Sequence, residues 1–277
     1  MKLRPNLPAL ALAAILFSNL PLAAQDHIFK SSYFHLNDSN YFLFGVPGTG
    51  PKPLNYGEYG NQVKFRVSVR YNVVPFSNDG AGSGVYAAFN QHSFWHLYES
   101  SAPFFDNNYN PQFYFYFDGA DVGGPEYGMQ GFIDHESNGR DGGESRSWNR
   151  FGVTLYVGDY ERSPVFGYFR FWEPFGVASE NRDLPQYAGQ GEVSVSWQPF
   201  IRQHYPLGAA GINLRSRIAG KGLIQNIELN GFLDPDALGL GKVTPSLMIQ
   251  VFYGTGEDLL TYDEARFALR VGFSMLR

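Results

Sequence analysis

The sequence predicts an all-β fold, a twelve-stranded antiparallel transmembrane β-barrel, and three observations lead to this prediction. Apolar and polar residues alternate with a period of two in one segment after another, as side chains on the two faces of a strand do. Glycine (32 residues) and aromatic residues (17%) are abundant, which favours β structure. Turn residues divide the chain into about twelve segments of about ten residues, an even number and a membrane-spanning length.

The N-terminal segment has the layout of a secretory signal peptide. Two basic residues precede an apolar core over residues 9–17, and small residues follow it. This core is too short to cross a hydrocarbon layer of about 30 Å as a helix. We therefore expect residues 1–24 to be a signal peptide and residues 25–277 to form a single outer-membrane β-barrel domain. A membrane anchor is the alternative, although Pro8 and Asn19 interrupt the apolar run.

Composition excludes several classes of function. The chain has a formal net charge of -5 without long runs of one sign, so no basic stripe is present that would neutralise nucleic-acid phosphates. No cysteine is present, so an exported protein must depend on the hydrogen bonds of its sheet rather than on disulfides. The sequence also contains no metal-binding histidine motif and no nucleotide-binding glycine loop.

Alternation is clearest in residues 62–74. Val63, Phe65 and Val67 begin an apolar face, and Lys64 and Arg66 begin the opposite polar face. A soluble β-sandwich also alternates, with its apolar face in the core, and it remains the alternative fold. The polar faces here carry both charge signs together with tyrosine and amide side chains, which favours a membrane barrel with a polar lumen.

The expected strands follow one another without a linker or a break in composition. We place them at residues 36–46, 62–74, 84–97, 111–118, 127–137, 146–158, 164–174, 187–199, 208–218, 222–232, 245–254 and 265–275. Loops 48–61 and 98–110, and the polar stretch 134–150, then lie at the end opposite the chain termini. If both termini are periplasmic, this end is extracellular.

The inward-facing positions carry many charges. They include Lys64, Arg66, Arg70, Asp134, Glu136, Arg150, Arg170, Arg215, Arg217, Glu228, Arg266 and Arg270. These side chains suggest a pore or, alternatively, a lumen filled by hydrogen-bonded ion pairs. At about twelve strands, long side chains are able to fill the interior, and we favour filling.

Residues 134–150 concentrate polar chemistry on the lipid side of the predicted barrel. His135 and Ser137 share a strand face with Ile133, and Asn149 shares its face with Phe151 on the next strand. Polar groups facing lipid cost about one to several kcal/mol each unless they have partners. A serine, a histidine and an orienting residue are the minimum set of a serine hydrolase. The alternative is that these side chains are ordinary hydrogen-bonding residues of the barrel rim.

The same stretch resembles a known family. His-x-Ser-Asn-Gly-Arg over residues 135–140, four variable residues, and Ser-Arg-Ser-Trp-Asn-Arg over 145–150 are similar to the signature of the outer membrane phospholipase A family. The likeness extends upstream over "FNQHSFWHLYESSAPFFDNNYNPQ", residues 89–112. The resemblance implies a twelve-stranded barrel with its active site on the outer surface, at the level of the outer leaflet, and phospholipid as substrate.

The resemblance also implies roles for individual residues. Ser137 would be the nucleophile, His135 the general base and acid, and Asn149 the residue that orients the histidine. The backbone amide of Gly139 would contribute to the oxyanion site.

A calcium ion and a second subunit are further implications of the resemblance. The ion would bind only where two barrels meet, to the backbone of Arg140, the hydroxyl of Ser145 and Ser101 of the other subunit. Ser100 is the alternative to Ser101. Gln91 would lie at the dimer interface. Asp141 and Glu144 either add charge near the metal or are exposed loop carboxylates.

Together with the signal peptide and the barrel pattern, the resemblance implies a calcium-dependent phospholipase of the bacterial outer membrane, active as a homodimer, with its site at the extracellular end. We expect it to hydrolyse acyl esters of glycerophospholipids, at the 1-acyl and 2-acyl positions, and of lysophospholipids. Two alternatives remain. One is a non-catalytic outer-membrane barrel, a small porin or adhesin, and the other is a lipid A acyl hydrolase.

Overall fold

A computed structural model describes residues 34–46, 62–76, 82–119, 127–158, 164–197, 210–219, 222–233 and 246–275. The predicted signal peptide lies outside these residues, so the division into a signal and a single domain remains a prediction. None of the helices in the described ranges is both long enough and apolar enough to cross a membrane.

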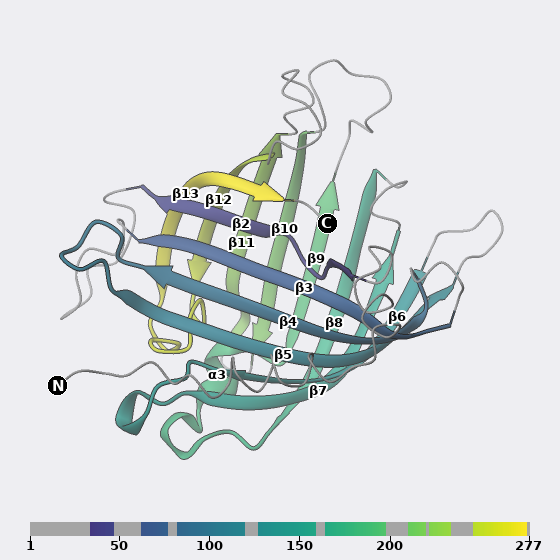
Figure 1. The fold of residues 1–277 in the computed structure, drawn as a ribbon, viewed down its shortest axis with the longest axis horizontal. Helices are drawn as coiled ribbons and strands as arrows, with labels where there is room; N and C mark the ends of the chain where they lie inside the picture. Colours follow the sequence, from purple (N-terminus) through teal and green to yellow (C-terminus); the bar gives the residue numbers. More distant parts are fainter. Residues whose placement is uncertain are drawn as a thin grey trace, which may run out of the picture.

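The described residues form one antiparallel sheet that closes on itself. Its strands are β1 (Phe34–Leu36), β2 (Asn40–Gly45), β3 (Val63–Pro75), β4 (Gly84–Trp95), β5 (Phe104–Gly119), β6 (Tyr127–Ser137), β7 (Ser147–Val157), β8 (Val165–Phe175), β9 (Gly191–Trp197), β10 (Ala210–Ala219), β11 (Gly222–Leu233), β12 (Ser246–Gly254) and β13 (Arg266–Met275). Each strand from β2 onward pairs with its neighbour in the chain, and β13 pairs with β2, which completes the ring. In Figure 1, β3, β4 and β5 cross in front of the strands of the far wall.

The first wall strand is interrupted. The sequence predicts one strand at 36–46, whereas the structure has β1 and β2 separated by residues 37–39. Both parts pair with β3, with Leu36 opposite Val69 and Tyr41 opposite Arg66. They are two sections of one strand with a bulge between them, so the ring has the twelve predicted members.

The prediction for β5 was too short. The sequence predicts a loop over residues 98–110, whereas β5 begins at Phe104. The inward side chains of Asp106, Asn108 and Asn110 are buried. They bond to distant groups, including the Leu259 amide and the His135 carbonyl. These long-range partners allow polar residues to continue the strand.

The segment before β9 was also assigned wrongly. The sequence predicts a strand from residue 187, whereas a short helix, α3 (Leu184–Ala188), occupies this position and β9 begins at Gly191. Pro185 lies in the first turn of the helix, where its missing N–H is not needed. Gly189, with φ of 89°, ends the helix. Residues 198–199 lie outside the described ranges.

The two faces of the wall have the predicted polarity. Ile133 and Phe151 are 50% and 52% exposed on the outer face, while the adjacent Asp134 and Arg150 are 4% and 8% exposed and form an ion pair of 2.8 Å in the lumen. The apolar side chains therefore face the surroundings and the charges face inward, which is the reverse of a soluble sandwich and is typical of a membrane barrel.

The segment between β12 and β13, residues 255–265, packs into one end of the lumen, and we call it the plug. Its Leu259 and Tyr262 are buried in a cluster with Trp148 and with Leu184 of α3. Its Glu257 is paired with Lys64 at 3.0 Å and with Arg270 at 2.6 Å. Burial raises the pKa of the Glu257 carboxyl, but attraction to Arg270 and Lys64 outweighs this effect and holds the pKa below its usual value.

The remainder of the lumen contains a cavity of about 720 Å³. It reaches Gly82, Asp118 and Gly158, beside the turns at the end opposite the plug. The expected filling by ion pairs is thus found at the plug end and only in part elsewhere. The side chain of Glu228, predicted to face the lumen, lies outside the described side chains.

Candidate active site

The sequence-predicted histidine and asparagine lie side by side on the outer wall. His135 of β6 is directly opposite Asn149 of β7 in the strand register. The histidine Nδ1 is 2.9 Å from the asparagine Oδ1. Because an amide oxygen only accepts, this contact requires the proton on Nδ1 and leaves the Nε2 lone pair of the neutral ring free to take a proton.

A turn after β8 holds the asparagine amide in this orientation. Asn149 Nδ2 donates to the carbonyl oxygens of Phe175 and Gly176, both at 3.3 Å. Gly176 has φ of 54°, and a Cβ added to it would lie 2.8 Å from Asn149 Nδ2. A side chain at this position would therefore be strained and would displace the amide.

Ser137 lies two residues beyond the histidine on the same outer face of β6. It is opposite Ser147 in β7 and Tyr109 in β5. Ser137, His135 and Asn149 are all half-buried. No hydrogen bond among the described residues joins the serine hydroxyl to the histidine ring, and such bonds are often completed only when substrate binds.

The loop between β6 and β7 is tied together by one buried side chain. Asn138 Oδ1 accepts from the amides of Arg140 and Arg146, at 3.3 and 3.0 Å, and Nδ2 donates to the Glu144 carbonyl at 2.9 Å. Gly139 has φ of 67°, and an added Cβ would lie 3.2 Å from the Tyr109 ring. These contacts fix the backbone immediately after Ser137.

The predicted calcium ligands present free oxygen atoms in this loop. The Arg140 guanidinium is engaged elsewhere, by Glu144 at 2.5 Å and by the Phe105 carbonyl. Within the described ranges, neither the Arg140 carbonyl nor the Ser145 hydroxyl takes part in a hydrogen bond. Calcium prefers hard oxygen ligands, including carbonyls and hydroxyls, so these donors fit the ion.

Carboxylates contribute little to the predicted calcium site in the β6–β7 loop. Asp141 and Glu144 are exposed, and Glu144 pairs with Arg140. Nowhere in the described part of the chain do three histidine, cysteine or acidic side chains gather to hold a metal. A metal site here would therefore use mainly neutral oxygens, a donor set that favours weak binding.

The turn between β4 and β5 carries the remaining predicted ligand. Ser101 is exposed and has φ of 65°, an uncommon conformation for a residue with a side chain. The turn is closed by the bond from Trp95 Nε1 to the Ala102 carbonyl, 2.8 Å. It lies at the same barrel end as the β6–β7 loop, but no hydrogen bond of the described residues links Ser101 to Arg140 or Ser145.

Gln91, predicted at the dimer interface, lies on β4 in the outward row that contains the exposed Phe89. Its Nε2 donates to Ser93 Oγ at 3.0 Å. It is opposite Tyr109, which is in turn opposite Ser137. Neighbouring strands are about 4.8 Å apart, so Gln91 and Ser137 are separated by only two strand spacings on one surface.

Sequence reasoning missed three residues that organise the site. Gly176 contacts the site from the turn after β8 and Tyr109 contacts it from β5. Asp106 lies beside the Arg140 side chain with a separation of 3.7 Å. Gly176 directly follows the aromatic row of β8, and a glycine at a strand end was the one signal available.

Comparison with known proteins agrees with this architecture. The sequence model of the family described as phospholipase A1 matches residues 50–275. Phospholipase A1 of Proteus vulgaris is 27% identical over 239 residues, covering 82% of this chain and 75% of the relative. Phospholipase A1 of Escherichia coli (strain K12) is 28% identical over 218 residues, covering 76% of this chain and 68% of the relative.

Solved structures show the same fold. Outer membrane phospholipase A from Escherichia coli superposes with a TM-score of 0.73 at 22% identity, covering 90% of this chain and 93% of that one. The Salmonella typhi outer membrane phospholipase dimer with bound calcium superposes with a TM-score of 0.71 at 22% identity, covering 91% and 94%. The fold of this chain is therefore that of a known outer-membrane barrel.

Proposed function

The chain belongs to the phospholipase A1 family, and we propose that it is a calcium-dependent phospholipase of the bacterial outer membrane with a Ser137-His135-Asn149 triad on its lipid-facing surface. The observation that carries the proposal is the contact of 2.9 Å between His135 and Asn149 beside Ser137, on a face that is otherwise apolar. A catalytic group on this lipid-facing surface would contact lipids of the membrane rather than a substrate dissolved in water.

The proposed reaction follows from these groups. Ser137 Oγ attacks the acyl carbonyl of a phospholipid while His135 Nε2 takes the hydroxyl proton. The alcohol of the lysolipid leaves with that proton, and water then releases the fatty acid from Ser137 by the same steps. Asn149 holds the ring and its tautomer, but as a neutral side chain it does not offset the imidazolium charge.

The residues after Ser137 support the charge that develops on the carbonyl oxygen. The Gly139 amide is suited to the oxyanion site, since a backbone N–H held in advance stabilises such charge. The Arg140 carbonyl and Ser145 hydroxyl would hold calcium. Bound calcium supplies positive charge for the oxyanion.

A homodimer completes this proposal. Ser101 would contribute to the calcium site of the second subunit; within its own subunit, no hydrogen bond of the described residues links it to Arg140 or Ser145. Gln91 would lie in the interface, close to the site on the same outer face. A solved relative was crystallised as a dimer with bound calcium, which supports this arrangement.

The proposed substrates are glycerophospholipids, cleaved at the 1-acyl and 2-acyl positions, and lysophospholipids. The site lies at the barrel end opposite Phe34 and Met275, the first and last residues of the described sheet. We propose that this end is extracellular, at the level of the outer leaflet. An enzyme in this position meets phospholipid only when phospholipid reaches that leaflet.

Fatty-acid release from phospholipid in detergent, with calcium or with chelator, tests the proposal. We expect calcium-dependent release by the wild type and a loss of about 10³-fold or more in Ser137→Ala. Ser147→Ala is the matched control, because this serine lies directly across the ladder, and it should retain activity. Full activity in Ser137→Ala would show that Ser137 is not the nucleophile.

The same preparation separates the alternatives. Ion conduction in planar bilayers without any release of fatty acid would support a porin, which the buried plug argues against. Deacylation of lipid A alone, in a mixture of phospholipid and lipopolysaccharide, would overturn the phospholipid substrate.

A further inference from the structure

The arginines of the lumen differ in whether their side chains form an ion pair. Arg66, Arg150, Arg170, Arg215, Arg217, Arg266 and Arg270 each form an ion pair with an aspartate or glutamate. Arg70, on β3, faces the same space. Among the residues that the structure describes, the Arg70 side chain takes part in neither an ion pair nor a hydrogen bond. Its guanidinium carbon lies over the Tyr86 ring, 5.2 Å from the ring centroid.

The cost of such an arrangement makes it informative. A charged group removed from bulk water without a partner is unfavourable, and the other luminal arginines offset that cost with carboxylates. The Nε atom of Arg70 is buried and unpartnered. The side chain lines the cavity of about 720 Å³, so space for a partner lies directly against it.

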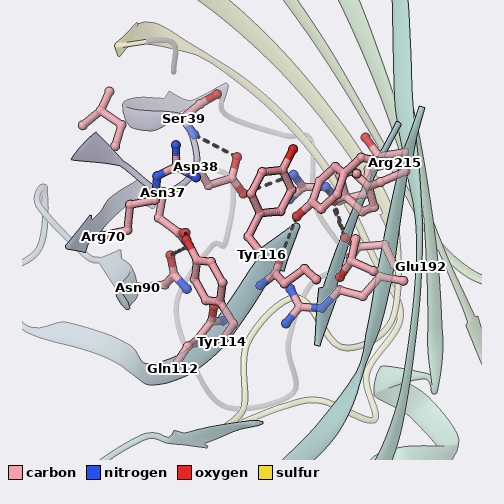
Figure 2. Close-up of a pocket in the computed structure, with 18 of the residues that line it drawn as sticks. Asn37, Asp38, Ser39, Arg70, Asn90, Gln112, Tyr114, Tyr116, Glu192 and Arg215 are labelled. Atoms are coloured by element: carbon pink, nitrogen blue, oxygen red, sulfur yellow. Dashed lines mark hydrogen bonds and ion pairs between the residues drawn. The ribbon is translucent and has the colours of Figure 1, made fainter. Parts of the chain in front are cut away.

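Several uncharged polar side chains line the cavity on the same side as Arg70. Tyr114 donates to Asn37 at 3.0 Å, and Asn37 donates to Asn90 at 3.2 Å. In Figure 2, these residues, Arg70 and Gln112 gather on one side of the cavity, while Arg215 and Glu192 lie on the other. Hydroxyl and amide groups of this kind recognise a polar ligand without competing with its charge.

The carboxylate next to this group is already committed. Asp38 projects from the bulge between β1 and β2 and binds Arg66 at 2.8 Å and Arg215 at 3.3 Å. Over the whole cavity the lining carries six arginines against four carboxylates, an excess of positive charge. Asp38 also shows how an oxyanion is held in this lumen, between two arginine side chains.

We infer that Arg70 and the adjoining amide and hydroxyl groups form a luminal binding site for a small anion that bears a carboxylate or phosphate group. The planar guanidinium presents two parallel N–H groups that match either oxyanion. The site is on the inner wall, whereas the proposed triad is on the outer wall. It is therefore independent of the phospholipase proposal.

Chemical labelling and thermal unfolding of the signal-free full chain in an uncharged maltoside detergent test this inference. Inorganic phosphate and acetate are titrated separately against chloride at constant ionic strength. We expect phosphate, acetate or both to protect Arg70 from phenylglyoxal at least about tenfold, with saturation, and to raise the unfolding temperature. Comparing the two anions identifies which oxyanion the site prefers.

Two substitutions make the result specific. Arg70→Gln breaks no ion pair of the described residues, so it should fold and lose the anion-dependent rise in unfolding temperature. Arg182→Gln is the matched control on the exposed surface and should keep that rise. An equal rise in Arg70→Gln would overturn the site. So would protection of wild-type Arg70 that does not saturate, or that equals protection of Arg182.

Discussion

Two loops at the same end of the barrel differ in whether their polar groups have partners within the protein. In the plug, Glu257 and Asp258 are buried and paired with cations of β3 and β13. In the β6–β7 loop, the Arg140 carbonyl and Ser145 hydroxyl have no hydrogen bonds among the described residues. One loop satisfies its charges internally and the other leaves neutral oxygens available.

The difference distinguishes structural polarity from functional polarity. Buried charges are retained where each has a partner, because an unpaired buried charge is costly. Free oxygen donors near solvent cost little, and they are what a ligand requires. The plug is therefore expected to control stability, and the β6–β7 loop to control activity.

Glu257→Gln should have the largest effect, and on stability alone. It leaves Lys64 and Arg270 buried without their shared carboxylate, which we expect to cost about 3–5 kcal/mol of unfolding free energy. Urea unfolding measures this loss. Fatty-acid release per folded molecule should be unchanged, and a large loss of release without a loss of stability would contradict the contrast between the loops.

Lowering the pH should remove the stabilisation that the Glu257 carboxylate provides. The folded pKa of Glu257 lies below its ordinary value of 4.5, so its stabilising effect is present above that value and is lost as the pH falls through the folded pKa. The stability advantage of the wild type over Glu257→Gln should hold from pH 7 to about 4.5 and shrink below it. If the stability advantage of the wild type grows on acidification, the pKa of Glu257 is raised on folding and not lowered.

Asn138→Ala should act on the other loop. Removal of the amide frees the backbone at Arg140 and Arg146, and we expect about 100-fold slower fatty-acid release together with a requirement for more calcium, since positioning of reacting groups is lost. The unfolding free energy should fall less than in Glu257→Gln. Unchanged calcium dependence would indicate that this loop does not hold the ion.

Gly176→Ala should have the smallest effect. A methyl group there strains the turn and displaces the Asn149 amide, and we expect about tenfold lower activity, comparable to disturbing a single orienting hydrogen bond. In an Asn149→Ala background the same change should have almost no further effect. Additive losses in this double-mutant cycle would mean that Gly176 acts through another group.

Local alternation was sufficient to predict the walls and the faces of the site. The strand 127–137 was predicted with its observed bounds, and the outward positions of His135 and Asn149 followed from their parity with Ile133 and Phe151. This succeeds because the two-residue period depends only on neighbouring residues.

Features that depend on distant partners could not be predicted in this way. The burial of Asp106 depends on the amides of Leu259 and Leu260, about 150 residues away in the sequence. The contact between Asn149 and Gly176 likewise joins separate strands. Local sequence carries no information about which remote group meets a polar side chain.

The pairing of β13 with β2, from Arg270 opposite Gly45 to Met275 opposite Asn40, has a consequence for assembly. Every other pair of adjacent wall strands is also adjacent in the chain, so those pairings can form as successive hairpins. The β2–β13 seam must bring together the two ends of the sheet and carries the largest loop-closure entropy. We expect β2 and β13 to pair last during insertion and to separate first under mechanical force.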